Sequence, residues 1–160
     1  MSHTLGHWQV KIIATYYYLC MARRESRETR SRIMSSIKSS GTGIEKAIAK
    51  ILVDLNLEFE EHPHDIFGKP DFVMRSSKIA IFCDGDFWHG FNMKTNPRLD
   101  IKNNREFWIR KIRFNIIRDS KVNKTLASSG WRVIRLWEHD IRDEPNKCRE
   151  TILATVGDSE

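Results

Sequence analysis

The chain lacks the cysteine pairs, long apolar runs and internal repeats that mark several large protein classes. Its three cysteines, Cys20, Cys83 and Cys148, form no CxxC pair, which argues against a disulfide framework and for a reducing cytoplasm. The apolar stretch VKIIATYYYLC at residues 10–20 is too short and too polar to span a bilayer. It also lacks a strongly basic start and a small-residue cleavage site, so it does not resemble a signal peptide. We therefore expect a cytoplasmic protein without a membrane anchor.

The remaining composition is that of one globular domain. The 160 residues are enough for one hydrophobic core. A hydrophobic fraction of 40% and a charged fraction of 30% are ordinary for soluble domains. The formal net charge of +6 is consistent with an anionic partner, although a slightly basic solvated surface explains it equally well.

The N-terminal region divides into two segments before the domain begins. Met21 opens an Arg-rich stretch that resembles the ordinary beginning of a protein. We therefore interpret residues 1–20 as an upstream extension, of the kind that a misassigned start codon would add. Residues 21–43 form a basic arm with little apolar character, and this arm can wrap a phosphate backbone or remain a disordered tail. Residues 44–160 are predicted to form a single domain. The basic residues of the arm are Arg23, Arg24, Arg27, Arg30, Arg32 and Lys38.

The domain begins with a helix and continues with three strands. Thr42 and Glu45 have the capping-box spacing at the start of TGIEKAIAKILVDLNL, whose apolar residues fall on one face. A short strand is predicted around Phe59. The runs DFVM and KIAIFCD, rich in Ile, Val and Phe, are separated by a short polar stretch and predict a hairpin.

A long helix, a strand and a final helix complete the order α-β-β-β-α-β-α, which predicts an α/β domain around a mixed sheet. The long helix covers residues 104–129 and ends at Gly130. WRVIRLW is the next strand, and PNKCRETILATV is the last helix, with Pro145 near its start. The residues expected to face inward on the long helix are Phe107, Ile109, Ile112, Ile116 and Ile117.

Two carboxylates and a histidine lie where the hairpin strands begin and end. Asp71 heads one strand and Asp84 ends the next, so the hairpin can bring the two carboxylates together around a divalent cation such as Mg²⁺. His89 follows five residues later and can act as an acid or base. Each feature alone is weak, because turns often carry Asp and a lone histidine is more often structural.

Five motifs in order give these residues a context. They are TRSRIMSSIKSSGTGIEK, GKPDFV, IFCDGDFWHG, NREFWIRKIRFNIIRD and GWRVIRLWEHDI, and they run from about Thr29 to Ile141. With these motifs the chain resembles the very-short-patch mismatch-repair endonucleases, which cut DNA beside T:G mismatches. The resemblance implies a restriction-endonuclease-like core, a central mixed sheet flanked by helices, and a basic N-terminal arm.

The resemblance assigns catalytic roles to five residues. Asp71 matches the metal-binding aspartate, and Cys83 stands where a main-chain carbonyl is the second protein ligand of Mg²⁺. His89 matches the histidine that activates the attacking water, and Asp119 matches the aspartate that orients it. Glu45 matches an acid that reaches toward the metal waters, and it also fits as half of the helix cap, so both roles remain open.

The same resemblance assigns the aromatic residues to DNA. Phe87, Trp88 and Trp108 match side chains inserted beside the mismatch, and Met34 matches an apolar residue that approaches from the opposite groove. A mismatch stacks poorly, so it is cheaper to open than matched DNA. Without the resemblance, Trp108 would be assigned to the helix core. Further expected DNA contacts are Arg30, Arg32, Lys111 and Asn115.

The chain departs from the family at a structural zinc site. Asp86 stands where many members have a cysteine, and Phe91 and Met93 replace further ligands. His139 remains without soft partners, whereas a structural zinc site needs four ligands. We therefore expect no structural zinc.

The sequence thus predicts a Mg²⁺-dependent endonuclease that nicks one strand beside T:G mismatches left by deamination of 5-methylcytosine. Two alternatives stay open: a protein that binds distorted duplex without cutting it, and a restriction-type nuclease of the same fold. We expect a monomer whose partner is mismatched double-stranded DNA, and general mismatch-repair proteins are candidate further partners.

Overall fold

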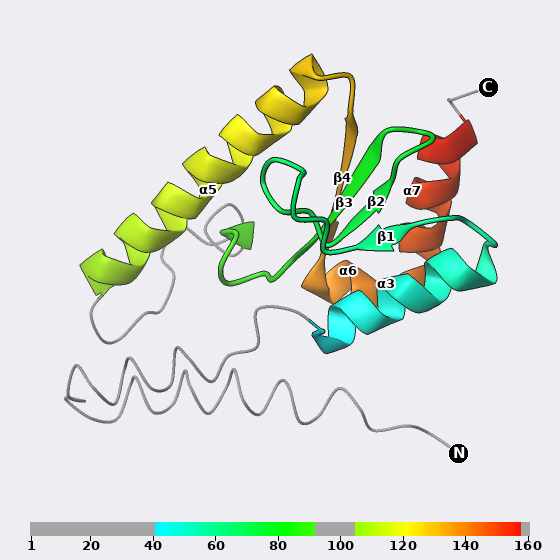
Figure 1. The fold of residues 1–160 in the computed structure, drawn as a ribbon. Helices are drawn as coiled ribbons and strands as arrows, with labels where there is room; N and C mark the ends of the chain where they lie inside the picture. The colour runs from blue at the N-terminus through cyan, green and yellow to red at the C-terminus, as the bar shows by residue number, and fades with distance from the viewer. Residues whose placement is uncertain (1–40, 92–104, 158–160) are drawn as a thin grey trace.

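The computed structural model describes residues 41–91 and 105–157, which form a central sheet with helices on both faces (Figure 1). The helices and strands follow one another in the predicted order, with one additional short helix before the last. The elements are α3 (Gly43–Asp54), β1 (Glu60–Glu61), β2 (Phe72–Met74), β3 (Ile79–Asp84), α5 (Arg105–Ser128), β4 (Arg132–Trp137), α6 (Glu138–Asp143) and α7 (Pro145–Gly157).

The sheet is mixed, as the sequence predicts. Its strand order is β1-β2-β3-β4, in which β2 pairs antiparallel with both β1 and β3 while β3 and β4 run parallel. The expected hairpin is therefore present, with Val73 opposite Ala80. The parallel pair needs a long crossover, which α5 provides. The predicted fold class, an α/β domain with a central mixed sheet flanked by helices, is confirmed.

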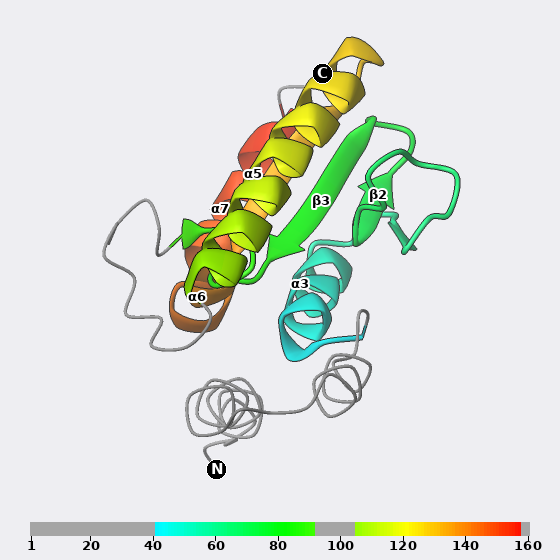
Figure 2. The same cartoon turned by 90° about the vertical axis from the view of Figure 1, so that its left-hand side faces the viewer.

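Alternate residues of the strands face two different layers of helix. One face packs against α3, α6 and α7, and the other packs against the C-terminal half of α5 through Val122 and Leu126. Figure 2 shows α5 and α3 on opposite sides of β3. Because side chains alternate along a strand, Phe82 and Asp84 of β3 and Arg135 of β4 share the α5 face. This alternation places the candidate Asp84 on the same side of the sheet as Arg135.

The start of α3 confirms the predicted capping box. The Thr42 hydroxyl accepts a hydrogen bond from the Glu45 amide at 3.4 Å, and the Glu45 carboxylate accepts from the Thr42 hydroxyl at 2.5 Å and from the Gly41 amide at 2.7 Å. These contacts satisfy backbone donors that the first helical turn leaves without partners. Glu45 is therefore fixed in direction before any ligand arrives.

The inward face of α5 differs from the predicted one. Phe107 and Ile117 are exposed, at 42% and 69% of their surface, whereas Trp108 and Asp119 are buried beside the expected Ile112. Only the C-terminal half of α5 reaches the sheet, so the N-terminal half packs against a loop and follows a different face. The prediction for Phe107 and Ile117 was wrong because an apolar pattern does not specify what a helix covers.

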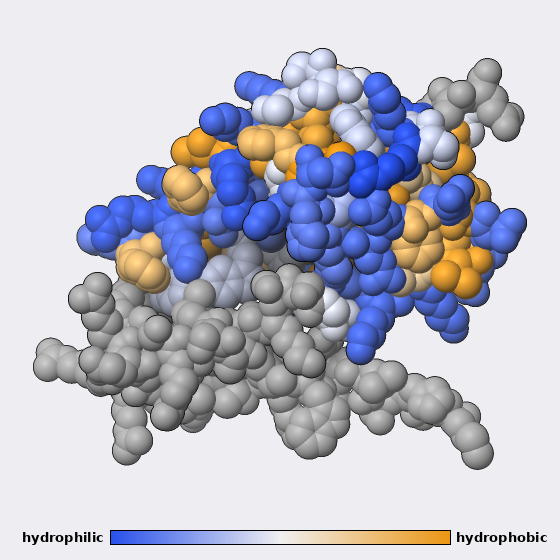
Figure 3. All heavy atoms as spheres, viewed as in Figure 1, coloured by the Kyte–Doolittle hydropathy of each residue, from blue (hydrophilic) through white to orange (hydrophobic). Residues whose placement is uncertain are grey.

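Two further features complete the described fold. The short helix α6 was not predicted, and its residue Ile141 is buried against the α3 side of the sheet. Apolar and hydrophilic residues are interspersed on the face seen in Figure 3. Among the residues that the structure describes, no helix combines the length and apolar character needed to cross a membrane.

Candidate active site

Glu45, His62 and Asp71 meet beside the end of β1 and the start of β2, and each offers a ligand atom within 4.8 Å of the others. Glu45 comes from the first turn of α3, His62 from the loop after β1, and Asp71 from the residue before β2. His62 Nε2 lies 3.2 Å from Glu45 Oε2. We call these three residues the Glu45–His62–Asp71 group, and it is the arrangement expected of a site for a divalent cation.

The electrostatics of Asp71 support this interpretation. The pKa of Asp71 is raised to about 6, chiefly because the carboxyl is buried; the hydrogen bond from the Cys83 amide lowers it, and the nearby charge of Glu45 raises it. A carboxylate in this environment is poorly compensated by protein groups. A bound cation would supply the missing positive charge, so the donor set fits a hard divalent metal.

The backbone of Cys83 lies directly against Asp71. The Cys83 amide donates to Asp71 Oδ2 at 2.7 Å. The amide and the carbonyl of one residue in a strand point to the same side, so the Cys83 carbonyl also faces the Asp71 side of β3. Burial raises the pKa of the Cys83 thiol well above its ordinary value, which keeps the sulfur protonated and a poor metal ligand.

His89 is held by two carboxylates on the other side of β3. Its Nδ1 lies 2.7 Å from Asp119 Oδ2 of α5 and 3.3 Å from Asp84 Oδ1 at the end of β3. Ionised carboxylates can only accept hydrogen bonds, so Nδ1 carries a proton and donates it. This fixes the tautomer and leaves Nε2 as the ring nitrogen that can accept a proton.

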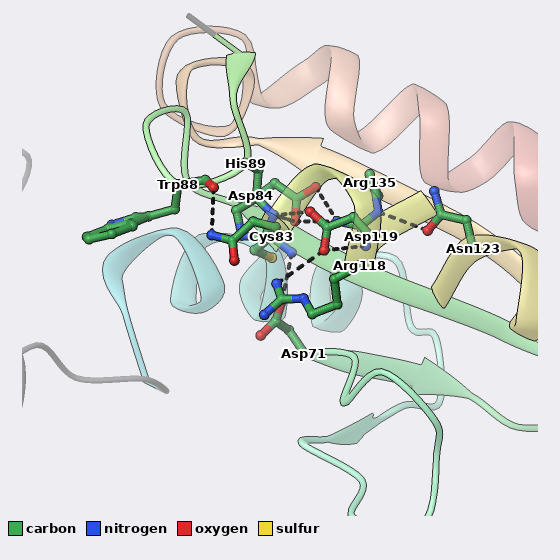
Figure 4. Close-up of polar contacts among 10 residues, drawn as sticks. Asp71, Cys83, Asp84, Trp88, His89, Arg118, Asp119, Asn123 and Arg135 are labelled. Carbon is green, nitrogen blue, oxygen red and sulfur yellow. Dashed lines mark hydrogen bonds and ion pairs between the residues drawn. The ribbon is translucent and has the colours of Figure 1, made fainter. Parts of the chain in front are cut away.

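A third charged residue, Arg135 of β4, joins both carboxylates. Its Nη1 donates to the two oxygens of Asp84 at 2.8 and 2.6 Å, and its Nη2 lies 3.4 Å from Asp119 Oδ1. Asp84 is therefore committed to Arg135 and does not join the Glu45–His62–Asp71 group, although the hairpin pattern allowed it to share a cation with Asp71. Figure 4 shows this network around His89.

The pKa of Asp119 reflects the same network. Burial alone raises it, but the hydrogen bond from His89 and the charge of Arg135 outweigh burial and lower it below the ordinary value. Arg118 adds a contact of 3.1 Å to Asp119 Oδ1. Asp119 thus stays ionised and can hold the Nδ1 proton of His89.

The loop between β3 and the undescribed segment positions His89 by its backbone. The His89 amide donates to the Gly85 carbonyl at 3.1 Å, and Asn115 Nδ2 of α5 donates to the Trp88 carbonyl at 2.9 Å. Gly90 has a φ of +79°, and a Cβ there would come within 2.7 Å of Ile116 on α5. Only glycine allows the loop to approach the helix so closely. Asn115, expected to contact DNA, thus has a structural role in the protein itself.

The aromatic candidates form one cluster beside the polar site. The ring centroids of Phe87, Trp88 and Trp108 lie 5.1–5.7 Å apart in edge-to-face contacts, and Phe107 contacts Trp108 at 5.1 Å. Trp108 is buried at 6% exposure, so it supports the rings that lie above it. Figure 4 shows the indole of Trp88 pointing away from the polar network. Lys111 Nζ lies 5.6 Å from the centroid of that indole.

The residues at the position where many family members are expected to bind structural zinc pack directly against one another. Asp86 Oδ1 lies 2.7 Å from His139 Nδ1, and the imidazole of His139 lies 4.1 Å from the ring of Phe91. Trp137 contacts Phe91 at 5.2 Å. These residues join the His89 loop to the end of β4 and the start of α6. Met93, Arg30, Arg32 and Met34 lie outside the described residues.

Comparison with known proteins establishes the family. The family model of DNA mismatch endonuclease Vsr matches residues 23–95. The DNA mismatch endonuclease Vsr of Escherichia coli (strain K12) is 35% identical over 132 residues, which cover 82% of this chain and 83% of the relative. The chain belongs to the Vsr family of DNA mismatch endonucleases.

Other Vsr-like relatives carry the name of nicking enzymes. The Type II nicking enzyme V.NmeDIP of Neisseria meningitidis serogroup C is 42% identical over 137 residues, covering 86% of this chain and 92% of the relative. V.HpaIIP of Haemophilus parainfluenzae is 44% identical over 121 residues, covering 75% and 85%. The catalytic domain of the homing endonuclease I-Bth0305I matches with a TM-score of 0.48 and 18% identity over 72% of this chain and 94% of that one.

Two polar residues of this Vsr-family site, His62 and Arg135, were missed by sequence reasoning. His62 is separated from Glu45 by a helix and a strand, and Arg135 lies 51 residues after Asp84. The Arg in WRVIRLW did carry a signal, because a charged residue inside an otherwise apolar strand needs a buried partner. His62 had no comparable signal, since a histidine in a polar loop is unremarkable.

Proposed function

We propose that this Vsr-family protein nicks one strand of DNA beside a T:G mismatch by hydrolysing a phosphodiester with the help of Mg²⁺. The supporting observation is the position of β3 between two groups of side chains. At Cys83 the strand backbone donates to Asp71, and the next residue, Asp84, contacts His89. A cation at Asp71 and a proton acceptor at His89 would then lie on either side of one strand, and this combination, which hydrolysis of a phosphodiester requires, supports the proposal.

Asp71 and the main-chain carbonyl of Cys83 are the proposed protein ligands of the cation. Glu45, held by its cap and by His62, faces the same position and can accept hydrogen bonds from waters on the cation. A divalent cation bound there would polarise the phosphodiester and acidify the attacking water. Hard oxygen donors favour Mg²⁺ for this role.

His89 is the proposed general base. Its Nδ1 proton is donated to Asp119, so Nε2 can take the proton of the attacking water while the water oxygen bonds to phosphorus and the bond to the leaving oxygen breaks. Asp119 keeps the ring in place and stabilises the charge that the imidazole gains, as in other carboxylate–histidine pairs.

The aromatic cluster is the proposed source of mismatch selectivity. Phe87 and Trp88 precede His89 on the same loop. If their rings were inserted between bases, they would therefore fix the distance from the mismatch to the cut. The buried Trp108 braces these rings rather than standing free. The mismatch is the cheapest place to insert a wedge because its bases stack poorly.

A duplex panel tests the proposal. The protein is incubated with end-labelled duplexes that are matched, carry T:G, or carry another single mismatch, with Mg²⁺ or with a chelator. We expect one nick, in one strand, beside T:G and only with Mg²⁺. Binding to T:G without any cut would favour a non-cleaving binder of distorted DNA. Cutting of matched duplex in both strands would favour a restriction-type nuclease.

A further inference from the structure

Arg135 of β4 forms side-chain contacts with both β3 and α5. Its side chain is 16% exposed and rises from β4, where it donates from Nε to Asn123 Oδ1 of α5 at 3.0 Å. It holds both oxygens of Asp84 on β3, and its guanidinium lies 4.6 Å from the centroid of Phe82. The planar group is thus fixed by partners on three sides, a task that suits arginine and not lysine.

The partners of Arg135 are the partners of His89. Asp84 and Asp119 both contact His89 Nδ1, and both contact the guanidinium of Arg135. The charged groups around His89 in the described residues are therefore Asp84 from β3, Asp119 and Arg118 from α5, and Arg135 from β4. Arg118 is half exposed, whereas the side chain of Asp84 is 4% exposed.

Burial makes this arrangement sensitive to Arg135. The two carboxylates beside the imidazole of His89 place two negative charges around one ring. The positive charge of Arg135 offsets theirs, and the two hydrogen bonds from its Nη1 to the carboxylate hold Asp84 in place. Asp84 without Arg135 would be a buried charge left with a histidine alone, which is costly.

We propose that Arg135 is a positioning residue for His89: through Asp84 and Asp119 it sets the orientation of the imidazole, and its positive charge offsets the two carboxylates beside the ring. The role rests on the proposed function, in which His89 is the base. Arg135 itself touches no reacting atom, and it acts only through the two carboxylates.

Arg132 on the same strand is the matched control. It donates to the carbonyls of Thr155 at the end of α7 and of Ser77 in the turn between β2 and β3, far from His89. Loss of its charge weakens the fold without altering the surroundings of the imidazole. Arg132→Gln and Arg135→Gln therefore separate a structural effect from a positioning effect.

The experiment follows the imidazole signal of His89 by NMR against pH in the full chain, with the histidines isotopically labelled and the His89 resonance assigned from a His89→Ala sample. We expect the titration midpoint to rise by about one pH unit in Arg135→Gln, because a positive charge is lost. In Asp84→Asn it should fall, because a negative charge is lost. Arg135→Lys should stay near the wild-type midpoint, and Arg132→Gln should match it.

Nicking of the T:G duplex gives a second readout on the same proteins. In Arg135→Gln the acid side of the pH profile of kcat should move upward with the NMR midpoint, while KM for DNA stays within about two-fold. Arg135→Lys should recover part of kcat. Shifts of the same sign in Arg135→Gln and Asp84→Asn, or unchanged midpoints in both, would overturn the positioning role.

The control His89→Ala distinguishes this inference from the proposed function. If His89→Ala nicks at the wild-type rate, His89 is not the base, and the positioning role falls together with that assignment. If His89→Ala is inactive but Arg135→Gln keeps the wild-type midpoint and kcat, only the role of Arg135 is wrong.

Discussion

The two charged groups on either side of β3 are built with opposite charge balance. The Glu45–His62–Asp71 group holds two carboxylates with no arginine or lysine recorded against them among residues 41–91 and 105–157, and the pKa of Asp71 rises to about 6. The group around His89 also holds two carboxylates, but Arg135 compensates both, and the pKa of Asp119 is lowered. The carboxylates of the first group thus lack a guanidinium partner among the described residues, whereas those of the second group share Arg135.

The difference shows how one fold assigns two jobs to the same residue type. Asp71 and Asp84 stand on neighbouring strands and looked equivalent in the sequence. Of these two aspartates, Arg135 contacts Asp84, because Arg135 and Asp84 both lie on the α5 face of the sheet. A carboxylate without a protein cation beside it is available to a metal ion. A carboxylate already paired with arginine, such as Asp84, is instead suited to hold a neighbouring side chain in place.

The largest effect is expected at Asp71. Asp71→Asn should abolish nicking, because it removes the anionic ligand, while binding to mismatched DNA changes by no more than a few-fold, since phosphate and aromatic contacts carry affinity. Rates and affinities on the same T:G duplex check this. Strong residual nicking would remove Asp71 from the mechanism.

The same substitution tests the charge balance through stability. Because the folded pKa of Asp71 is raised above its unfolded value, the contribution of Asp71 to stability is fully present below pH 3.8 and is lost as the pH rises through about 6. Above that pH, Asp71→Asn should raise the free energy of unfolding in chelator by up to about 3 kcal/mol. Asp84→Asn should lower it, because Arg135 loses its bidentate partner. Chemical denaturation at pH 7.5 compares the two, and equal changes would contradict the contrast.

His89 and its partner come next. His89→Ala should lower the nicking rate by about 10²–10⁴, the usual contribution of one acid–base group. Asp119→Asn should cost less, because it disturbs the orientation and charge of the ring without removing it. Single-turnover rates on one duplex rank the two variants. A greater loss in Asp119→Asn would reverse the proposed dependence.

The aromatic loop is expected to affect selectivity more than rate. Trp88→Ala should weaken binding to T:G duplex by about five- to 150-fold, from the roughly 1–3 kcal/mol of stacking on one aromatic. Binding to matched duplex and the melting temperature should change little. If instead the melting temperature falls by many degrees and both duplexes lose affinity alike, Trp88 is a core residue and the wedge is not supported.

The smallest effect concerns the packing of Asp86 and His139, at the position of the family's structural zinc site. Protein purified without chelators should contain well under one zinc per chain, and a mild chelator should not unfold it. His139→Ala should lower the free energy of unfolding by about 1 kcal/mol, since the half-buried contact to Asp86 is lost. Stoichiometric zinc in metal analysis would mean that other residues provide the ligands.

Local patterns predicted most of the secondary structure. The cap at Thr42, the hairpin of β2 and β3 and the end of the long helix near Gly130 are confirmed, because each depends on residues close in sequence. The exposed side of α5 at Phe107 and Ile117 was not predicted, because the partner of a helix face is chosen by distant elements. The short helix α6 gave too little pattern to recognise.

The sequence by itself determined which side chains are the candidates for the proposed chemistry: the carboxylates of Asp71 and Asp119, the imidazole of His89 and the aromatics after β3 all stand in motifs that can be read along the chain. Only the tertiary structure decided how they are grouped. His62 joins Glu45 and Asp71, and Arg135 takes Asp84 away from them across 51 residues. Charge compensation depends on distances of a few ångströms through space, and sequence order does not contain those distances.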